Sequence, residues 1–293
     1  MSRFGIAQIS LNGTLRAGVR GYQLDRGLEI ESDGSDGVVY ETAHHLIAAK
    51  PMADITSLSL KTMLSALNDS TDLPLESLDG ASGLVMYGQK AASNAPGFAS
   101  GSVHLTRTGL RGLIYMAGLR WSRGSKAEMA LRAMFKAASG ETDPITAGSG
   151  ALPTQPTPDL GFALSSLTLA GDTIDTVNSF EIGIDPKFEF EYSTGLPYPT
   201  DITGAGANGK LAITGRADLG DCDLGDGEGS CVAVFKRYAI GGGFGSDTVT
   251  LTLNAAWSTE EGIGGENGSP MGRNLFIRTR HDGSTKPFTW QLA

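Results

Sequence analysis

Hydrophobic and polar residues alternate one by one along much of this chain. The pattern is clearest in Leu28-Glu29-Ile30-Glu31 and in Phe188-Glu189-Phe190-Glu191, which are apolar on one face and acidic on the other. Each stretch leads into a turn-forming segment, Ser32 to Gly37 in the first case and Ser193 to Gly195 in the second. The alternation predicts a mainly β protein built from hairpins.

The same strand pattern occurs twice, in the same order, at an offset of 158 residues. An apolar strand closing on a turn glycine comes first, followed by an aromatic strand and later by an Ile-Thr pair. The matched positions are Phe4, Ile6, Ile9, Leu11 and Gly13 with Phe162, Leu164, Leu167, Leu169 and Gly171; Val19, Tyr22 and Leu24 with Val177, Phe180 and Ile182; and Ile55-Thr56 with Ile213-Thr214. Chance explains one similar strand pair but not a shared order, so we predict a tandem duplication.

The later parts of the two copies align at other offsets because their loops differ in length. Leu113 to Ser122 resembles Val249 to Ser258 at an offset of 136, which places Trp121 opposite Trp257. Near the end of each copy, a Gly-x-x-x-Pro turn recurs at an offset of 143. The residues between the copies are rich in Gly, Pro and Thr and predict an extended linker. We therefore predict one domain at 1–147, a linker at 148–160 and a second domain at 161–293.

Each predicted domain has at most one short helix. Thr62 to Asn68 is the helix candidate of the first copy, because a helix-ending Asp and Pro environment follows it, and Asp218 to Gly229 replaces it in the second copy. Lys126 to Ala138 has helical propensity, but its counterpart, Asn274 to His281, alternates like a strand. We therefore predict a strand there too.

Charge and hydropathy limit the possible partners. The formal charge of the 293 residues is -9, and 41 of them are glycine, which indicates many tight turns. A protein that grips nucleic acid needs a basic face, whereas an acidic surface repels DNA. No apolar run approaches the roughly 18 to 20 residues of a membrane helix, and the N-terminus lacks a signal-peptide pattern. We expect a soluble protein made in a cytosol, with no membrane partner.

The sequence predicts no metal or cofactor. An acidic loop with Asp221 and Asp223 begins like a calcium-binding EF-hand, but Gly225 stands where a third acidic ligand belongs, which favours a solvated loop. Cys222 and Cys231 are too few for a disulfide framework, and we expect reduced thiols. The four histidines, His44, His45, His104 and His281, lack ligand spacing.

No catalytic constellation is present either, so we predict that the protein is not an enzyme. Gly241 to Gly245 is glycine-rich, but it lacks the lysine and the helix of a phosphate-binding loop and is typical of a loop tip. Paired carboxylates at Glu29/Glu31 and Glu189/Glu191 could suggest a hydrolase. Their recurrence in both copies favours a repeated acidic surface instead.

The order of elements, with Phe180 to Asp185 (FEIGID) followed by Tyr198-Pro199 and a closing Thr/Gly strand, resembles the tail tube proteins of long-tailed bacteriophages, and the resemblance is strongest from Ala151 through Asp201. It implies β-sandwich or half-barrel domains that form six-fold rings, with sheets of neighbouring subunits joined into a continuous inner barrel. It also implies stacked rings, with an acidic lumen through which DNA passes during ejection without specific binding.

For a tandem chain, the resemblance implies three chains in a pseudo-six-fold ring rather than six. The implied partners are other copies of the chain and other tail proteins, in a virion tail assembled in the host cytoplasm. Turns and a small-residue loop are the predicted contact sites. The candidate assembly residues are Asp33, Gly34, Asp36 and Gly37; Ser193, Thr194 and Gly195; Gly241, Gly242, Gly243 and Phe244; and the loop from Ala91 to Gly101.

Two other virion roles stay open on the sequence. A tail-tip or baseplate hub protein can also hold two tube-like domains in a pseudo-six-fold trimer. A β-rich carbohydrate-binding module of the virion surface would expose clustered Trp and Tyr residues, whereas Trp121 and Trp257 occur in similar contexts at predicted strand ends.

Overall fold

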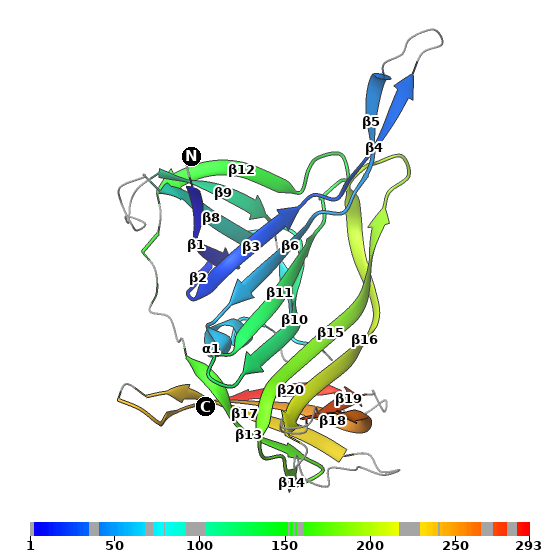
Figure 1. Cartoon of the computed structure of the whole chain (residues 1–293). Coiled ribbons are helices and arrows are strands. Elements are labelled where there is room, and N and C mark those ends of the chain that lie inside the picture. Colours follow the sequence, from blue (N-terminus) through cyan, green and yellow to red (C-terminus); the bar gives the residue numbers. More distant parts are fainter. Residues whose placement is uncertain are drawn as a thin grey trace.

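A computed structural model describes residues 3–34, 41–67, 73–78, 80–91, 103–151, 153–154, 156, 161–216, 229–239, 241–264, 272–279 and 286–293. These residues form twenty β-strands and one short α-helix (Figure 1). The mainly β prediction is therefore confirmed.

The strands divide naturally between the two halves of the chain. The first half contains β1 (Arg3–Leu11), β2 (Thr14–Arg16), β3 (Val19–Asp25), β4 (Leu28–Gly34), β5 (Glu41–Ala49), β6 (Met52–Ser57), α1 (Leu60–Leu64), β7 (Leu75–Leu78), β8 (Leu84–Ala91), β9 (Val103–Gly109), β10 (Gly112–Ser122), β11 (Glu128–Phe135) and β12 (Ile145–Ala151). The second half contains β13 (Phe162–Leu169), β14 (Asp172–Thr173), β15 (Val177–Tyr192), β16 (Pro199–Arg216), β17 (Gly229–Tyr238), β18 (Phe244–Gly264), β19 (Gly272–Thr279) and β20 (Phe288–Leu292).

Three sheets result, and every pairing is antiparallel. A five-stranded sheet has the order β12-β9-β8-β1-β2, and the hairpin β4–β5 forms a sheet of its own. The largest sheet has the order β14-β13-β17-β18-β19-β16-β15-β10-β11-β6-β3, with β20 paired to β18 and β7 to β10. This sheet runs through both halves, and Figure 1 shows β3, β6, β11, β10, β15 and β16 side by side across the middle of the molecule.

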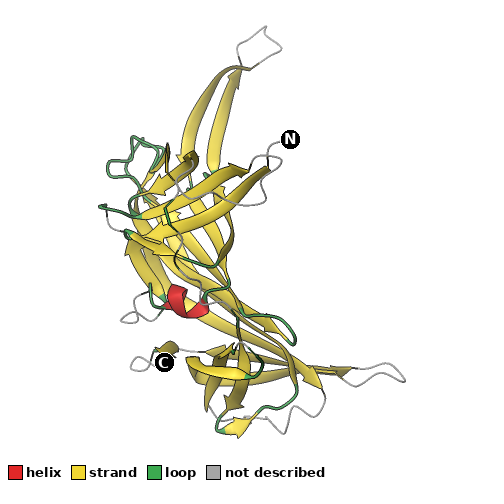
Figure 2. Cartoon of the chain, turned by 90° about the vertical axis from the view of Figure 1, so that its left-hand side faces the viewer, coloured by secondary structure: helices red, strands yellow, loops and turns green. Residues whose placement is uncertain are grey.

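The core lies between the layers of strands. Ile9 and Met86 of the five-stranded sheet belong to the same buried cluster as Ile55 and Leu131 of the large sheet. The helix adds Leu60, Met63 and Leu64, all buried, and Figure 2 shows it as the single red element beside the strands. The cluster continues into the second half through Phe180 and Phe235, whose ring centroids are 5.5 Å apart.

The helix and the ambiguous segment after residue 126 follow packing more than propensity. Helix α1 begins at Leu60, two residues before the predicted start, because Leu60 and Met63 fill the core one turn apart. It ends at Leu64, so residues 65–67 of the predicted helix form a turn instead, and Asn68 lies outside the described residues. Residues 128–135 form strand β11, as predicted. Strand pairs with both β10 and β6 satisfy its backbone on two sides and override its helical propensity.

Strand registers repeat between the halves at the offset of 158. Strand β3 pairs with β6 at Tyr22↔Ile55, and β15 pairs with β16 at Phe180↔Ile213. Bulges recur at the same positions, between Ile6 and Gln8 in β1 and between Leu164 and Ser166 in β13. The turns after these two strands have positive φ at both central residues, Asn12-Gly13 (46° and 81°) and Ala170-Gly171 (52° and 97°), as a two-residue hairpin of type I′ requires.

Farther along the chain, the strand pairing aligns the two halves at an offset of 144 residues and not at the predicted offset of 136. Leu131 of β11 pairs with Met116, and Leu275 of β19 pairs with Glu260. Trp257 therefore corresponds to Leu113 and not to Trp121, so the alignment of the two tryptophans is wrong. The two offsets differ by eight, an even number, so both keep the apolar residues on one face; only pairing with the neighbouring strands distinguishes them.

The predicted linker begins inside a strand. Strand β12 pairs with β9 from Ile145↔Gly109 to Ala151↔Val103. Residues 148–151, placed in the linker on their glycine and serine content, therefore belong to the five-stranded sheet. The equivalent strand of the second half, β20, pairs with β18 at Phe288↔Leu253, which keeps the offset of 143 at this end of each half.

Candidate assembly surface

A direct strand pair joins the two halves. Strands β10 and β15 are antiparallel, in register from Gly118↔Gly183 to Ser122↔Ser179. Leu119 and Ile182 pair across the junction and are both 1% exposed. The strands approach closely because residue 118 is glycine: a Cβ there would lie 2.8 Å from the Ile182 carbonyl oxygen. The junction is thus a closely packed part of one sheet, with one buried face and one exposed face.

The halves are arranged head to tail within this sheet. Strand β15 pairs with β16 in the same register in which β3 pairs with β6. Strand β10 pairs with β11 in the same register in which the distal part of β18, Ser258 to Gly264, pairs with β19. At one end of the series, β3 pairs with β6 and with no other described strand. At the other end, Ser258 to Gly264 of β18 pair with β19 alone among the described strands. Among the described residues, the outer side of each end therefore lacks a strand partner for its backbone N–H and C=O groups.

Burial differs between the paired strand and the unpaired one. Val177, Phe180 and Ile182 of β15 are 7%, 0% and 1% exposed. Their equivalents on β3, Val19, Tyr22 and Leu24, are only partly buried. Desolvation raises the pKa of Tyr22, and the charge of nearby Arg107 opposes that shift. Strand β3 is therefore an amphipathic strand whose outer side lacks a neighbour among the described residues.

Three charged side chains connect this edge with the junction. The buried carboxylate of Glu128 on β11 accepts a hydrogen bond of 2.6 Å from Arg20 of β3 and another from Arg120 of β10. The three residues line a hollow of about 690 Å³ beside the β10–β15 pair. Both guanidinium groups reach solvent, and their charge-assisted hydrogen bonds compensate the buried carboxylate. This cluster holds β3, β10 and β11 in one arrangement.

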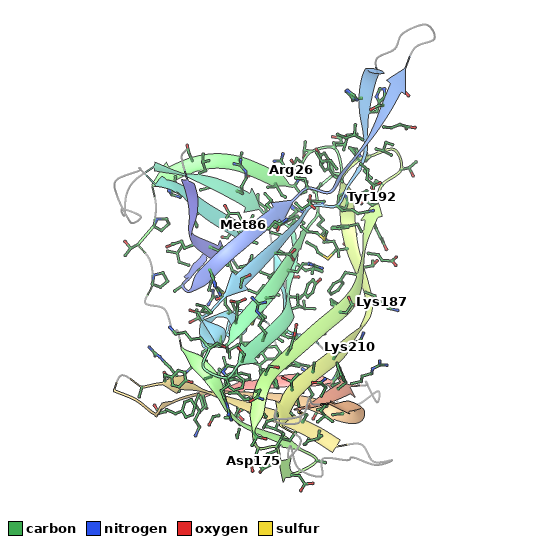
Figure 3. All side chains as sticks on the ribbon, viewed as in Figure 1. Arg26, Met86, Asp175, Lys187, Tyr192 and Lys210 are labelled. Carbon is green, nitrogen blue, oxygen red and sulfur yellow. The ribbon has the colours of Figure 1, made fainter. Side chains whose placement is uncertain are left out.

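Hairpin β4–β5 projects from the body of the molecule, with its base against the tip of hairpin β15–β16 (Figures 1 and 3). The Ala49 amide donates to the Pro197 carbonyl at 2.9 Å, and the Tyr192 hydroxyl donates to the Ala49 carbonyl at 3.0 Å. Leu28, which pairs with Ala49 at this base, is 47% exposed, and Ile30 and Ile47 beyond it are 58% and 53% exposed. The projecting hairpin therefore carries apolar side chains into solvent.

Glutamates alternate with apolar residues on both hairpins. Glu29 accepts a hydrogen bond of 2.7 Å from Lys50, and Glu189 and Glu191 lie exposed on β15. Cations lie among them: Lys187 and Lys210 are on the same hairpin as these two glutamates (Figure 3). The exposed charges of the large sheet thus have both signs.

The predicted contact residues fall into separate places. Asp33 and Gly34 end β4, and Ser193, Thr194 and Gly195 form the exposed turn between β15 and β16, where Gly195 has a φ of 76°. Gly241, Gly242 and Gly243 all have positive φ in the turn before β18, where Phe244 stacks on Tyr238 at 5.2 Å. This turn belongs to the end of the molecule opposite β4–β5 (Figure 1). Asp36, Gly37, residues 92–100 and the acidic loop at 218–228 lie outside the described residues.

The described residues include no cluster of three or more His, Cys, Asp and Glu side chains that could hold a metal ion. On the projecting hairpin, His44 Nδ1 lies 2.8 Å from Ser32 Oγ, and His45 Nε2 lies 3.1 Å from Asp33 Oδ2, all exposed. Cys231 is buried in β17. In the part of the chain that the structure describes, no helix is both long and apolar enough to cross a bilayer.

The sequence placed the candidate contact residues at turns and did not identify which strands lie at the ends of the large sheet. The available signal was the matched triplet Val19, Tyr22, Leu24 and Val177, Phe180, Ile182, which identifies β3 and β15 as equivalent strands. It does not reveal that only one of them has neighbours on both sides. No protein-family model matches this chain, and no curated protein matches it either.

Proposed function

We propose that this chain is a structural virion protein, a tandem tail tube protein whose rings stack into the tube that conducts DNA during ejection. One observation carries the proposal. Two halves with matching strand registers are already joined edge to edge, and the joined series β3-β6-β11-β10-β15-β16-β19-β18 has an unpaired edge at each end. A unit of this kind adds further copies at both ends until a ring closes.

Three chains per ring is the stoichiometry we propose. The resemblance to tail tube proteins implies six domains in a ring, and each half supplies one domain, so three chains complete it. With eight strands of the joined series in each chain, the inner barrel of a trimer contains three times eight, or 24, strands. Closure pairs both end strands of the joined series, so neither is left as a template for aggregation.

DNA is proposed to pass through the lumen without being gripped. The net charge of -9 supports this, because an acidic protein repels DNA overall, while exposed cations such as Lys187 and Lys210 are interspersed with the glutamates of the large sheet. The protein works by assembly and needs no reaction chemistry.

The projecting hairpin β4–β5 is proposed to lock one ring to the next. Leu28, Ile30 and Ile47 supply exposed apolar area that burial against a neighbouring ring would stabilise. Ile30→Asp should therefore leave rings intact and shorten or abolish tubes. Glu31→Gln, one residue away on the opposite face of the strand, should leave tube length unchanged.

Negative-stain microscopy combined with mass measurement tests the assembly. Purified protein should form stacked rings of pseudo-six-fold outline with the mass of three 30.5 kDa chains. Rings of six chains would contradict the stoichiometry, and single rings that never stack would favour a tail-tip hub. A dispersed monomer that binds glycans would overturn the proposal in favour of a surface carbohydrate-binding module.

A further inference from the structure

The strand pair β10–β15, which joins the two halves inside one chain, indicates how two chains would pair. Matching strand registers identify the equivalent strands in the two halves. Every pair between β3 and β6 recurs between β15 and β16 with both numbers raised by 158, as in Tyr22↔Ile55 and Phe180↔Ile213. Pairs of β10 with β11 recur between β18 and β19 with both numbers raised by 144, as in Leu119↔Met129 and Ile263↔Arg273.

Applying these offsets to the β10–β15 pair gives a specific contact. Leu119↔Ile182 becomes Ile263↔Leu24, and Arg120↔Glu181 becomes Gly264↔Gln23. Within one chain, β3 and the distal part of β18 are opposite ends of the joined series. The derived pairs can therefore form only between two copies of the chain.

We propose that β3 of one chain pairs antiparallel with residues 262–264 of β18 in a second copy, in the register Leu24↔Ile263 and Gln23↔Gly264. This inference rests on the proposed function only in requiring self-assembly; the two edges and their register follow from the strand pairing. The contact joins different strands and so runs head to tail, which permits closure into a ring.

The residues of β3 are compatible with pairing to a strand of a second copy of the chain. Val19 to Asp25 contain no proline, and the two charged residues of the strand, Arg20 and Asp25, leave Gly21 to Leu24 between them uncharged. Val19, Tyr22 and Leu24 are partly buried where Val177, Phe180 and Ile182 are buried. A neighbouring strand would bury these three side chains further. The apolar pair Leu119 and Ile182 at the junction becomes the apolar pair Ile263 and Leu24 at the derived contact.

Cysteine cross-linking tests the register. In a chain that carries Cys222→Ser, Gln23→Cys and Gly264→Cys are introduced together, because directly opposed residues of antiparallel strands lie within disulfide range. Mild oxidation should convert most of the protein into covalent multimers that end at one closed species on a non-reducing gel. We expect at least about tenfold more multimer than with either single substitution.

Two controls make the result specific. Gln23→Cys combined with Ser258→Cys places the second thiol six residues away along β18, about 20 Å from the derived partner, and should give no multimers above the single substitutions. A dimer formed by Gln23→Cys alone would show that two β3 strands pair with each other, and it would overturn the proposal.

Microscopy of the same samples separates this inference from the proposed function. Rings without the double-cysteine cross-link would overturn the proposed register while leaving the ring-forming function intact. Absence of both rings and cross-links would overturn both. Leu24→Lys gives an independent readout: it should lower the assembled fraction at least about tenfold because it adds a charge at the buried contact, with an unchanged circular dichroism spectrum. Wild-type assembly by this variant would contradict the proposal.

Discussion

Strands β3 and β15 have the same register, the same apolar triplet and the same place in their halves of the chain, yet they differ in burial. Phe180 is fully buried on β15, while its equivalent on β3, Tyr22, is partly buried and its phenol is only partly desolvated. The difference is a neighbour: β15 lies against β10, and the outer side of β3 has no described strand beside it. The burial of the same apolar triplet therefore depends on whether another strand pairs with the outer side of its own strand.

The largest expected effect comes from truncating the paired strand. Phe180→Ala should lower the free energy of unfolding by about 3 to 5 kcal/mol, because it opens a cavity beside Phe235 in the buried cluster of the second half. Tyr22→Ala should cost clearly less in the unassembled chain, because its side chain is already partly in water. Denaturant titrations of both variants provide the comparison, and equal losses would show that the neighbouring strand does not decide their contributions.

The second-largest effect is expected where β10 and β15 approach each other closely at the junction. Gly118→Ala should cost about 1 to 3 kcal/mol, because the new Cβ would lie 2.8 Å from the Ile182 carbonyl oxygen and force β10 and β15 apart. Gly183→Ala is the matched control: residue 183 faces Gly118 in the register, and a methyl group there would meet no other part of the described chain within 4 Å. Thermal unfolding measures both variants, and equally stable proteins would contradict the close packing.

The two equivalent turns differ in one contact. Gly13→Ala and Gly171→Ala each place an alanine at a positive φ, 81° and 97°, so each should cost about 1 kcal/mol. A Cβ at residue 13 would also lie 3.2 Å from Ser82 Oγ, whereas a Cβ at residue 171 would meet no described atom within 4 Å, so Gly13→Ala should cost more. Thermal unfolding of the two single variants measures both losses, and a larger loss for Gly171→Ala would contradict this ranking.

The smallest effect concerns an ion pair between the halves. Lys61 of α1 donates to Asp247 at 3.1 Å, and Arg237 donates to the same carboxylate at 3.2 Å; the hydrogen bonds from Lys61 and then Arg237 lower the pKa of Asp247. A lowered pKa stabilises the fold above the ordinary pKa of aspartate, and that contribution is lost as the pH falls through the lowered value.

Lys61→Met should therefore reduce stability at pH 7 by less than about 1 kcal/mol, since both partners are solvent-accessible. The difference from the unsubstituted protein should shrink as the pH falls below the ordinary pKa of aspartate, for example to pH 3. Lys187→Met, an exposed position on β15, is the control. Urea titrations at the two pH values measure the effect, and a pH-independent loss would assign it to other contacts of Lys61, such as the hydrogen bond of 2.8 Å that it donates to the Ala293 carbonyl oxygen.

Local features of the fold followed from the sequence. Alternation located the strands, including β11, whose composition favours a helix, and the residues of both copies placed the turns at Gly13 and Gly171. The helix was two residues off because its start is set by which leucines reach the core. The tryptophan alignment was wrong because a shift of eight residues preserves alternation, so the pattern contains no information about it.

The sequence by itself determined the mainly β character, the order of the strands and the offset of 158, because a period of two residues and the φ preference of turn glycines are local properties. Only the tertiary structure decided that β10 pairs with β15, that residues 148–151 are a strand, and that β3 and the distal part of β18 are the unpaired edges. Strand partners are chosen by packing between residues far apart in the chain. The same apolar pattern is therefore compatible with a strand inside a sheet and with a strand at its edge.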